Sequence, residues 1–141
     1  MQLKLSDIKA KILIIDDDAD VRNAVRMTLE SERGVKYAFV EAGDVVSGLK
    51  ALKSNKSDVV ILDLHMPGED GFDFVEKLKK DKSLPLTKVV ILTADDSIKN
   101  LWRAVNKGIS AYNFMGKPFI ADELRAMVLS LVMPYQSTWT A

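Results

Sequence analysis

Three short stretches of the chain are apolar at every position, and they limit its possible folds more than any other feature. They are Ile12–Ile15, Val59–Leu62 and Val89–Leu92. A strand with one face in solvent alternates apolar and polar residues. A strand that helices cover on both faces is apolar throughout and rich in β-branched residues. The three stretches therefore predict buried parallel strands.

Segments with the 3.6-residue period of an amphipathic helix lie between and after these strands. Two weaker strands are expected over 35–40 and 112–115, the second just ahead of Lys117. A strand followed by a helix, five times over, predicts an α/β fold with a parallel sheet and right-handed crossovers. Five strands in one domain fit the doubly wound, flavodoxin-like order 2-1-3-4-5. The helices are expected over 21–29, 45–52, 72–80, 98–105 and 124–132.

Composition restricts the classes of function. A chain of 141 residues has the length of a single domain. Its 20 basic and 20 acidic residues balance, so no overall field attracts nucleic acid or anionic lipid. The absence of Cys excludes disulfides and thiolate chemistry and is compatible with a reducing compartment. No apolar stretch reaches the roughly 20 residues of a membrane span. We therefore predict a cytoplasmic protein that contacts neither nucleic acid nor membrane directly.

Polar side chains follow the predicted buried strands at the point where each strand ends. Asp16 and Asp17 follow the first apolar stretch, Asp63 the second and Thr93 the third. The carboxyl ends of parallel strands share one edge of the sheet, and ligands bind there, in the crevice where the winding reverses. Three neighbouring carboxylates repel one another unless a cation lies among them, and oxygen ligands alone suit Mg²⁺ or Mn²⁺. Together with Lys117, the set is typical of phosphoryl transfer.

Four motifs in this order resemble the receiver domain of bacterial two-component response regulators. They are ILIIDDD from Ile12, DVVILDLHMPGEDG from Asp58, ILTA from Ile91 and KPF from Lys117. The resemblance implies a single-domain, chemotaxis-regulator-like signalling module rather than an enzyme. It divides the chain into an N-terminal extension (1–10), a receiver domain (11–133) and a C-terminal tail (134–141).

The resemblance also implies a role for each clustered acidic residue. Asp63 would accept a phosphoryl group from the phosphohistidine of a sensor histidine kinase or of a histidine phosphotransfer protein. Asp17 would bind Mg²⁺ directly and Asp16 through water. Asp63 and the main-chain carbonyl of His65 would complete the set of metal ligands.

Further roles implied by the resemblance concern the phosphoryl group and its read-out. Thr93 and Lys117 would contact the phosphoryl oxygens, and a cis peptide would precede Pro118. The aromatic switch residue would be Phe114. The spacing before Lys117 is about two residues longer than is usual in the family, so Tyr112 is a rival for that role.

Residues around the site are assigned in the same way. His65 and Asp95, two positions after the acceptor and after the threonine, would tune the lifetime of the phosphoryl group. The fourth helix, fifth strand and fifth helix would form the surface that binds a downstream protein target or a second copy of the chain. Trp102 lies on an apolar helical stripe, so we expect it in the core, with partner contact as the alternative.

Two other interpretations remain open. Asp16 and Asp18 after an apolar strand, Thr93 at a strand end and the later Lys117 imitate three motifs of a haloacid-dehalogenase-like phosphatase, with Asp16 as the nucleophile. That interpretation leaves Asp63 without a role, and the expected acidic pair at a strand end is missing. The third interpretation is a structural or dimerising module that keeps the fold without signalling.

Overall fold

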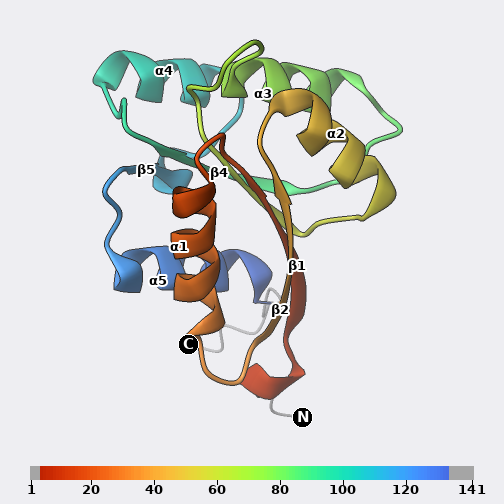
Figure 1. The fold of residues 1–141 in the computed structure, drawn as a ribbon, viewed down its shortest axis with the longest axis vertical. Helices are drawn as coiled ribbons and strands as arrows, with labels where there is room; N and C mark the ends of the chain where they lie inside the picture. The colour runs from red at the N-terminus through yellow and green to blue at the C-terminus, as the bar shows by residue number, and fades with distance from the viewer. Residues whose placement is uncertain (1–3, 134–141) are drawn as a thin grey trace, which may run out of the picture.

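The computed structural model describes residues 4–133, in which five parallel strands alternate with five α-helices (Figure 1). Short 3-10 turns, η1 (Leu5–Asp7) and η2 (Ala111–Asn113), precede the first and last strands. The predicted tail over 134–141 lies outside the described residues. The strands are β1 (Lys9–Ile15), β2 (Lys36–Ala42), β3 (Val59–Leu62), β4 (Lys88–Thr93) and β5 (Phe114–Gly116). The helices are α1 (Ala19–Glu30), α2 (Val45–Ser54), α3 (Gly71–Lys80), α4 (Ile98–Asn106) and α5 (Ala121–Val132).

The strands lie in the order β2-β1-β3-β4-β5, and every neighbouring pair is parallel. In Figure 1, α1 and α5 cover one face of the sheet, and α2, α3 and α4 cover the other. The predicted α/β class and the doubly wound, flavodoxin-like order 2-1-3-4-5 are confirmed. The winding reverses between β1 and β3, so the loops after these strands diverge to opposite faces and leave a crevice between them.

The two helical layers explain why the central strands are apolar throughout. Along β1, Ile12 and Ile14 pack in the cluster of α1 and α5, while Leu13 and Ile15 pack in the cluster of α2 and α3. All four are at most 1% exposed. Burial of one such side chain contributes roughly 1.5–3 kcal/mol. This packing fixes the strand ends, and with them the residues that follow each strand.

The fifth strand begins later than predicted. The sequence pattern placed it at 112–115, whereas β5 begins at Phe114, which pairs with Ile91 of β4. Tyr112 lies in η2 and is 89% exposed. The Ser110 hydroxyl accepts a hydrogen bond from the Tyr112 N–H at 3.2 Å, and this local bond favours a turn over a strand. The start of the strand was therefore wrong by two residues.

The prediction that Trp102 lies in the core was also wrong. Trp102 is 61% exposed and Ile98, on the same stripe, is 73% exposed. The buried residues of α4 are Asn100 and Ala104. Asn100 donates from its side chain to the main-chain oxygen of Asp95 at 3.1 Å, which turns this face of the helix inward. A polar contact to the preceding loop, and not the apolar stripe, sets the rotation of α4.

Candidate functional site

The residues predicted at the strand ends converge at one edge of the sheet. The main-chain N–H of Asp63 donates to the Ile15 carbonyl at 2.9 Å, and that of Lys117 donates to the Thr93 carbonyl at 2.8 Å. Asp16 donates in the same way to Ala42 at 3.1 Å. These bonds extend the sheet ladder one residue beyond the strands. The backbone of each site residue is therefore fixed by the sheet and does not belong to a free loop.

Lys117 joins two of the carboxylates. Its Nζ lies 2.6 Å from Oδ2 of Asp16 and 3.4 Å from Oδ2 of Asp63. All three side chains are largely buried, with 18%, 5% and 6% of their areas exposed. Burial alone would lower the pKa of Lys117, but its hydrogen bond to Asp16 and the charges of Asp16 and Asp63 raise that pKa above the usual value. Lys117 is therefore a cation at neutral pH.

The surroundings of Asp63 disfavour the charged form of its carboxyl group. Burial, followed by the negative charge of Asp16, raises the pKa of Asp63 above its ordinary value, although Lys117 and the His65 N–H act in the opposite direction. The His65 N–H lies 3.3 Å from Oδ1 of Asp63. The main chain of residue 65 therefore lies beside the Asp63 carboxylate, with its N–H directed toward that carboxylate.

Asp16, Asp17 and Asp63 form a cluster that could hold a metal ion. Each offers a carboxylate oxygen, and these oxygens lie within 4.8 Å of one another. Asp17 is exposed while the other two are buried, so the cluster opens to solvent on the Asp17 side. All three residues were predicted as a group from their places at the strand ends.

Arg22 belongs to the site, and the sequence reasoning missed it. Its Nη1 donates to the main-chain oxygen of Asp16 at 2.6 Å, and its Nε pairs with Glu41 at 3.1 Å. The Asp18 N–H donates to Oδ1 of Asp16 at 2.9 Å and fixes the carboxylate. The available signal was the place of Arg22 in the first turn of the helix that follows the acidic loop.

Thr93 and the pair His65 and Asp95 lie on the other side of the cluster. Thr93 is fully buried, and its Oγ1 accepts a hydrogen bond from the Asp95 N–H at 3.2 Å. Asp95 Oδ2 lies 3.2 Å from His65 Nε2. Hydrogen bonds from Ser97, and then from His65, lower the pKa of Asp95. The two exposed side chains thus bridge the β3–α3 and β4–α4 loops at the rim of the site.

The aromatic residues before Lys117 differ in their surroundings. Phe114 on β5 is partly buried and packs against the cluster of α2, α3 and α4, whereas Tyr112 is exposed. The peptide bond between Lys117 and Pro118 is cis, as expected. Of the two candidate switch residues, only Phe114 is partly buried; Tyr112 is exposed.

A doubly wound sheet with three carboxylates, a buried hydroxyl and a lysine at its carboxyl edge defines a class of phosphoacceptor signalling domain. The comparison with protein families identifies the class further. Residues 12–129 match the model of the response regulator receiver domain. The chain belongs to this family, whose members are signalling modules that interact with histidine kinases and downstream effectors.

Individual relatives agree with this assignment. The chain is 36% identical over 114 residues to the C4-dicarboxylate transport transcriptional regulatory protein DctD of Rhizobium meliloti, covering 80% of this chain and 23% of DctD. The receiver domain of the Francisella response regulator 1452 superposes with a TM-score of 0.74 at 31% identity, covering 87% of this chain and 96% of that chain. The chemotaxis protein CheY4 of Vibrio cholerae superposes with a TM-score of 0.75 at 27% identity, covering 89% of this chain and 99% of the CheY4 chain.

The chain spans only 23% to 53% of the length of the curated relatives that it matches. These comparisons give no support to the haloacid-dehalogenase-like alternative. Within residues 4–133, no helix combines the length and the apolar character needed to cross a membrane.

Proposed function

We propose that Asp63 is the phosphoacceptor of this receiver domain and that Mg²⁺-dependent transfer from a phosphohistidine switches its surface for partner binding. The observation that carries the proposal is the position of Lys117 Nζ, within 3.4 Å of Asp63 and 2.6 Å of Asp16. These residues come from three strand ends far apart in the chain. Sheet stability alone does not require a buried cation between two buried carboxylates, whereas phosphoryl transfer does.

The donor set of the acidic cluster fits Mg²⁺. The carboxylates of Asp16, Asp17 and Asp63 supply oxygen atoms only, which suits a hard cation, with Mn²⁺ as a substitute. We assign direct binding to Asp17 and Asp63, contact through water to Asp16, and a further ligand to the main-chain carbonyl of His65. When bound, Mg²⁺ supplies neutralisation of the charge shared by the carboxylates and the phosphoryl oxygens.

The transfer needs one nucleophile and one neutralising cation from the chain. An Asp63 oxygen attacks phosphorus, the P–N bond breaks, and its electron pair returns to the imidazole nitrogen of the donor, which takes up a proton. The carboxylate charge is replaced by about two negative charges at neutral pH. The ammonium of Lys117 and the hydroxyl hydrogen of Thr93 then bind phosphoryl oxygens. The Thr93 hydroxyl is available because its oxygen accepts a hydrogen bond from Asp95 and donates none among the described residues.

The read-out follows from the movement of Thr93. Inward movement of its side chain vacates space beside β5, and Phe114 fills that space by changing its rotamer. Phe114 has no hydroxyl, so this switch acts through packing alone. The rotamer change of Phe114 alters the surface of α4. There, Ile98 and Trp102 are exposed and offer apolar contacts to a protein target.

His65 and Asp95 control the lifetime of the phosphoryl group in this proposal. Their contact at 3.2 Å crosses the rim of the site, where hydrolytic water must pass. Separation of the pair therefore opens a path for water to the acyl phosphate.

The partners of the domain follow from the same chemistry. The donor is a sensor histidine kinase or a histidine phosphotransfer protein. The recipient is a protein target or a second copy of the chain, bound on the surface of α4, β5 and α5. Several relatives are named transcriptional regulators, but we assign no direct nucleic-acid or membrane contact to this domain, which we place in the cytoplasm.

The test is Mg²⁺-dependent formation of a beryllofluoride adduct, which mimics the phosphoryl group, followed by ¹⁹F NMR. The wild type should form the adduct, Asp63→Asn should form none, and Asp122→Asn, at an exposed position in the first turn of α5, should behave as the wild type. Adduct formation by Asp63→Asn would refute the proposal. Loss on Asp16→Asn alone would instead favour the phosphatase-like alternative, and absence of an adduct in the wild type would favour a structural module.

A further inference from the structure

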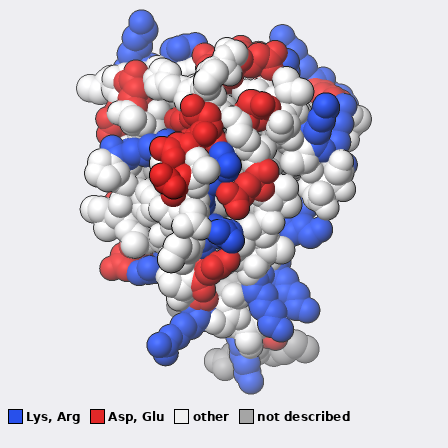
Figure 2. Space-filling model, in the orientation of Figure 1, with Lys and Arg blue, Asp and Glu red and all other residues white. Residues whose placement is uncertain are grey.

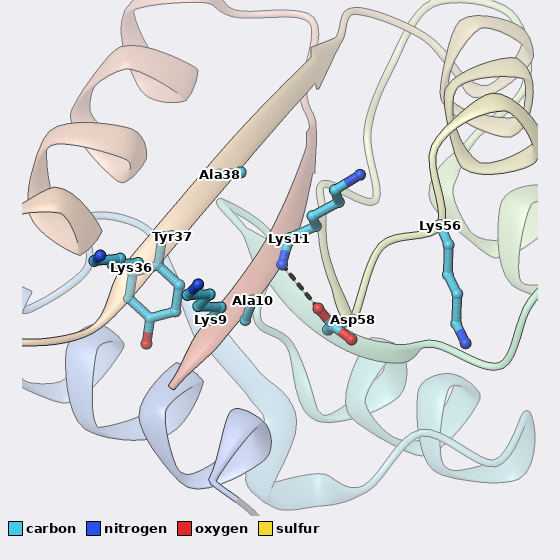
Figure 3. Close-up of a pocket in the computed structure, with 8 residues that line it drawn as sticks. All are labelled: Lys9, Ala10, Lys11, Lys36, Tyr37, Ala38, Lys56 and Asp58. Atoms are coloured by element: carbon cyan, nitrogen blue, oxygen red, sulfur yellow. Dashed lines mark hydrogen bonds between the residues drawn. The ribbon is translucent and has the colours of Figure 1, made fainter. Parts of the chain in front are cut away.

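The sheet has a second, uncovered surface at the end opposite the acidic site. On the α2 side of β1 and β2, Leu13 and Ile15 lie under helices, whereas Lys9, Lys11 and Lys36 of the same face are exposed. Figure 1 shows the lower halves of β1 and β2 extending beyond α2. A cleft of about 560 Å³ lies there (Figure 3). The cleft is lined by Lys9, Ala10, Lys11, Lys36, Tyr37, Ala38, Lys56 and Asp58.

The charge of this basic cleft is not balanced within the molecule. The lining contains four lysines, Lys9, Lys11, Lys36 and Lys56, and one carboxylate, that of Asp58; within residues 4–133 none of the four lysines forms an ion pair. In Figure 2, Lys and Arg predominate at the lower end of the face in view, while Asp and Glu gather higher up. A chain of zero net charge thus concentrates an excess of positive charge at one place.

Stability does not account for these lysines. Lys9 and Lys36 are direct partners in the register of β1 and β2, so their side chains lie side by side on one face of the sheet. Two like charges on neighbouring strands repel each other. Among residues 4–133 no ion pair compensates Lys9 or Lys36, which points to an anionic partner from outside the chain.

Two hydrogen bonds hold Asp58 against β1 at the cleft. Oδ2 of Asp58 accepts the main-chain N–H of Lys11 at 2.8 Å, and the Asp58 N–H donates to the Lys11 carbonyl at 2.8 Å. The dashed line in Figure 3 marks the first of these bonds. Ala38 lies in register with Lys11, on the same face of the sheet, and carries only a methyl group, so an extended backbone can approach the sheet closely there. Leu86, which is 95% exposed just before the start of β4, lies beside an adjoining cleft and adds an apolar contact.

We propose that the basic cleft binds an acidic, extended segment of a protein partner. Residues 1–3 and 134–141 contain no Asp or Glu, so they do not supply the complementary side chains. A nucleic acid fits the cleft less well. Its lining has no Arg, and Asp58 would repel a continuous line of phosphates. The inference does not depend on phosphorylation of Asp63, which lies at the opposite edge of the sheet.

The test is a titration of the ¹⁵N-labelled 141-residue chain with a peptide of alternating Glu and Ala. Chemical-shift changes should be confined to the backbone around Lys9–Lys11, Lys36–Ala38 and Lys56–Asp58. Raising the salt from about 0.1 M to about 1 M shortens the screening length from about 10 Å to about 3 Å and should weaken binding several-fold. A matched peptide of alternating Gln and Ala should not bind.

The variant Lys9→Gln/Lys36→Gln should bind the acidic peptide about tenfold more weakly, since two of the four ammonium groups are lost. Its thermal stability should equal or exceed that of the wild type, because the variant removes a like-charge pair. The control Lys50→Gln/Lys82→Gln carries the same charge change at exposed positions outside the cleft and should bind as the wild type does.

Three results would overturn the inference. The first is the absence of shifts at the cleft, or shifts confined to the acidic site. The second is equal binding by the wild type and Lys9→Gln/Lys36→Gln. The third is tighter binding of an oligothymidylate, or of phosphatidylserine vesicles, than of the acidic peptide, which would make the surface a nucleic-acid or membrane site.

Discussion

Replacing Lys117 with Met removes the one ammonium group that contacts two carboxylates of the acidic cluster and keeps a side chain of similar length. Lys117 Nζ lies 2.6 Å from Asp16 and 3.4 Å from Asp63. At an effective dielectric constant of about 20, these contacts correspond to attractions of about 6 and about 5 kcal/mol. The cost of removing the ammonium group from water offsets much of this sum. We expect Lys117→Met to lower the free energy of unfolding by about 3 kcal/mol, the size typical of one lost partner in a buried ion pair.

The loss of stability in Lys117→Met should be smaller when Mg²⁺ is bound. Without Lys117, three carboxylates whose oxygens lie within 4.8 Å of one another have no compensating cation from the side-chain contacts that the structure describes. Mg²⁺ binding then neutralises a larger excess of charge than in the wild type. At a free concentration about 100-fold above the dissociation constant, a ligand stabilises the folded state by about 2.7 kcal/mol. We therefore expect Mg²⁺ to raise the melting temperature of Lys117→Met more than that of the wild type.

Thermal unfolding with EDTA and with Mg²⁺, followed by circular dichroism, measures both effects. A loss of about 3 kcal/mol corresponds to a fall of about 10 °C in a domain of this size. The matched control is Lys107→Met, which removes a lysine paired with Glu76, whose side chain is 40% exposed, and should change stability less, because solvent screens that pair more than the pairs of Lys117. If Lys117→Met loses no more stability than Lys107→Met, or if Mg²⁺ stabilises it no more than the wild type, the electrostatic reasoning is wrong.

Two further predictions concern the backbone and the charge of Asp63. A Cβ at residue 71 would lie 2.4 Å from the main-chain oxygen of Asp63, so Gly71→Ala should destabilise by about 1–3 kcal/mol in urea unfolding; an unchanged midpoint would contradict the close approach. Because burial and Asp16 raise the pKa of Asp63, the wild type should lose stability as the pH rises through the unfolded-state pKa of Asp63, and that loss should persist above its folded-state pKa. In EDTA, Asp63→Asn should therefore be more stable than the wild type at pH 7, and this gain should vanish below both pKa values; a gain that is independent of pH would exclude the charge as its cause.

The parts of the site that could be predicted from the sequence are those that the sheet itself determines. The last residue of each apolar stretch marks the carboxyl end of a buried strand. The positions of Asp16, Asp63 and Thr93 therefore followed from counting to the end of each stretch. Asp16 and Asp63 continue the ladder of backbone hydrogen bonds beyond their strands, and Thr93 is the last residue of β4 in that ladder. Asp44 has the residue type preferred at a helix N-cap, and its side chain accepts the Ser47 N–H at 2.7 Å at the start of α2.

Features that depend on contacts between distant segments could not be predicted in this way. The 3.6-residue stripe on α4 identified a helix correctly, but its rotation depends on the bond between Asn100 and the Asp95 carbonyl. By helix propensity alone, Gly48 within α2 costs up to about 1 kcal/mol relative to alanine. In the fold a Cβ there would lie 2.5 Å from Cδ1 of Ile15, so the glycine allows α2 to approach β1 closely. Helix propensity disfavours glycine at this position and packing against Ile15 requires it, and the packing contact cannot be predicted from the local sequence.

The contacts of Lys117 also bear on how the switch is set. The ammonium of Lys117 is shared between Asp16 and Asp63. Under the proposed function, a phosphoryl group on Asp63 would compete with Asp16 for this ammonium. The free energy that drives the switch is therefore a difference between two ion-pair arrangements, not the full attraction between lysine and phosphoryl oxygens. A difference of a few kcal/mol moves a two-state population from mostly one form to mostly the other. Under the proposed function, the close contact with Asp16 would stabilise the inactive form and set how much of the domain is active before phosphorylation. Weakening that contact alone, with Asp63 intact, should raise the active fraction of the unphosphorylated domain.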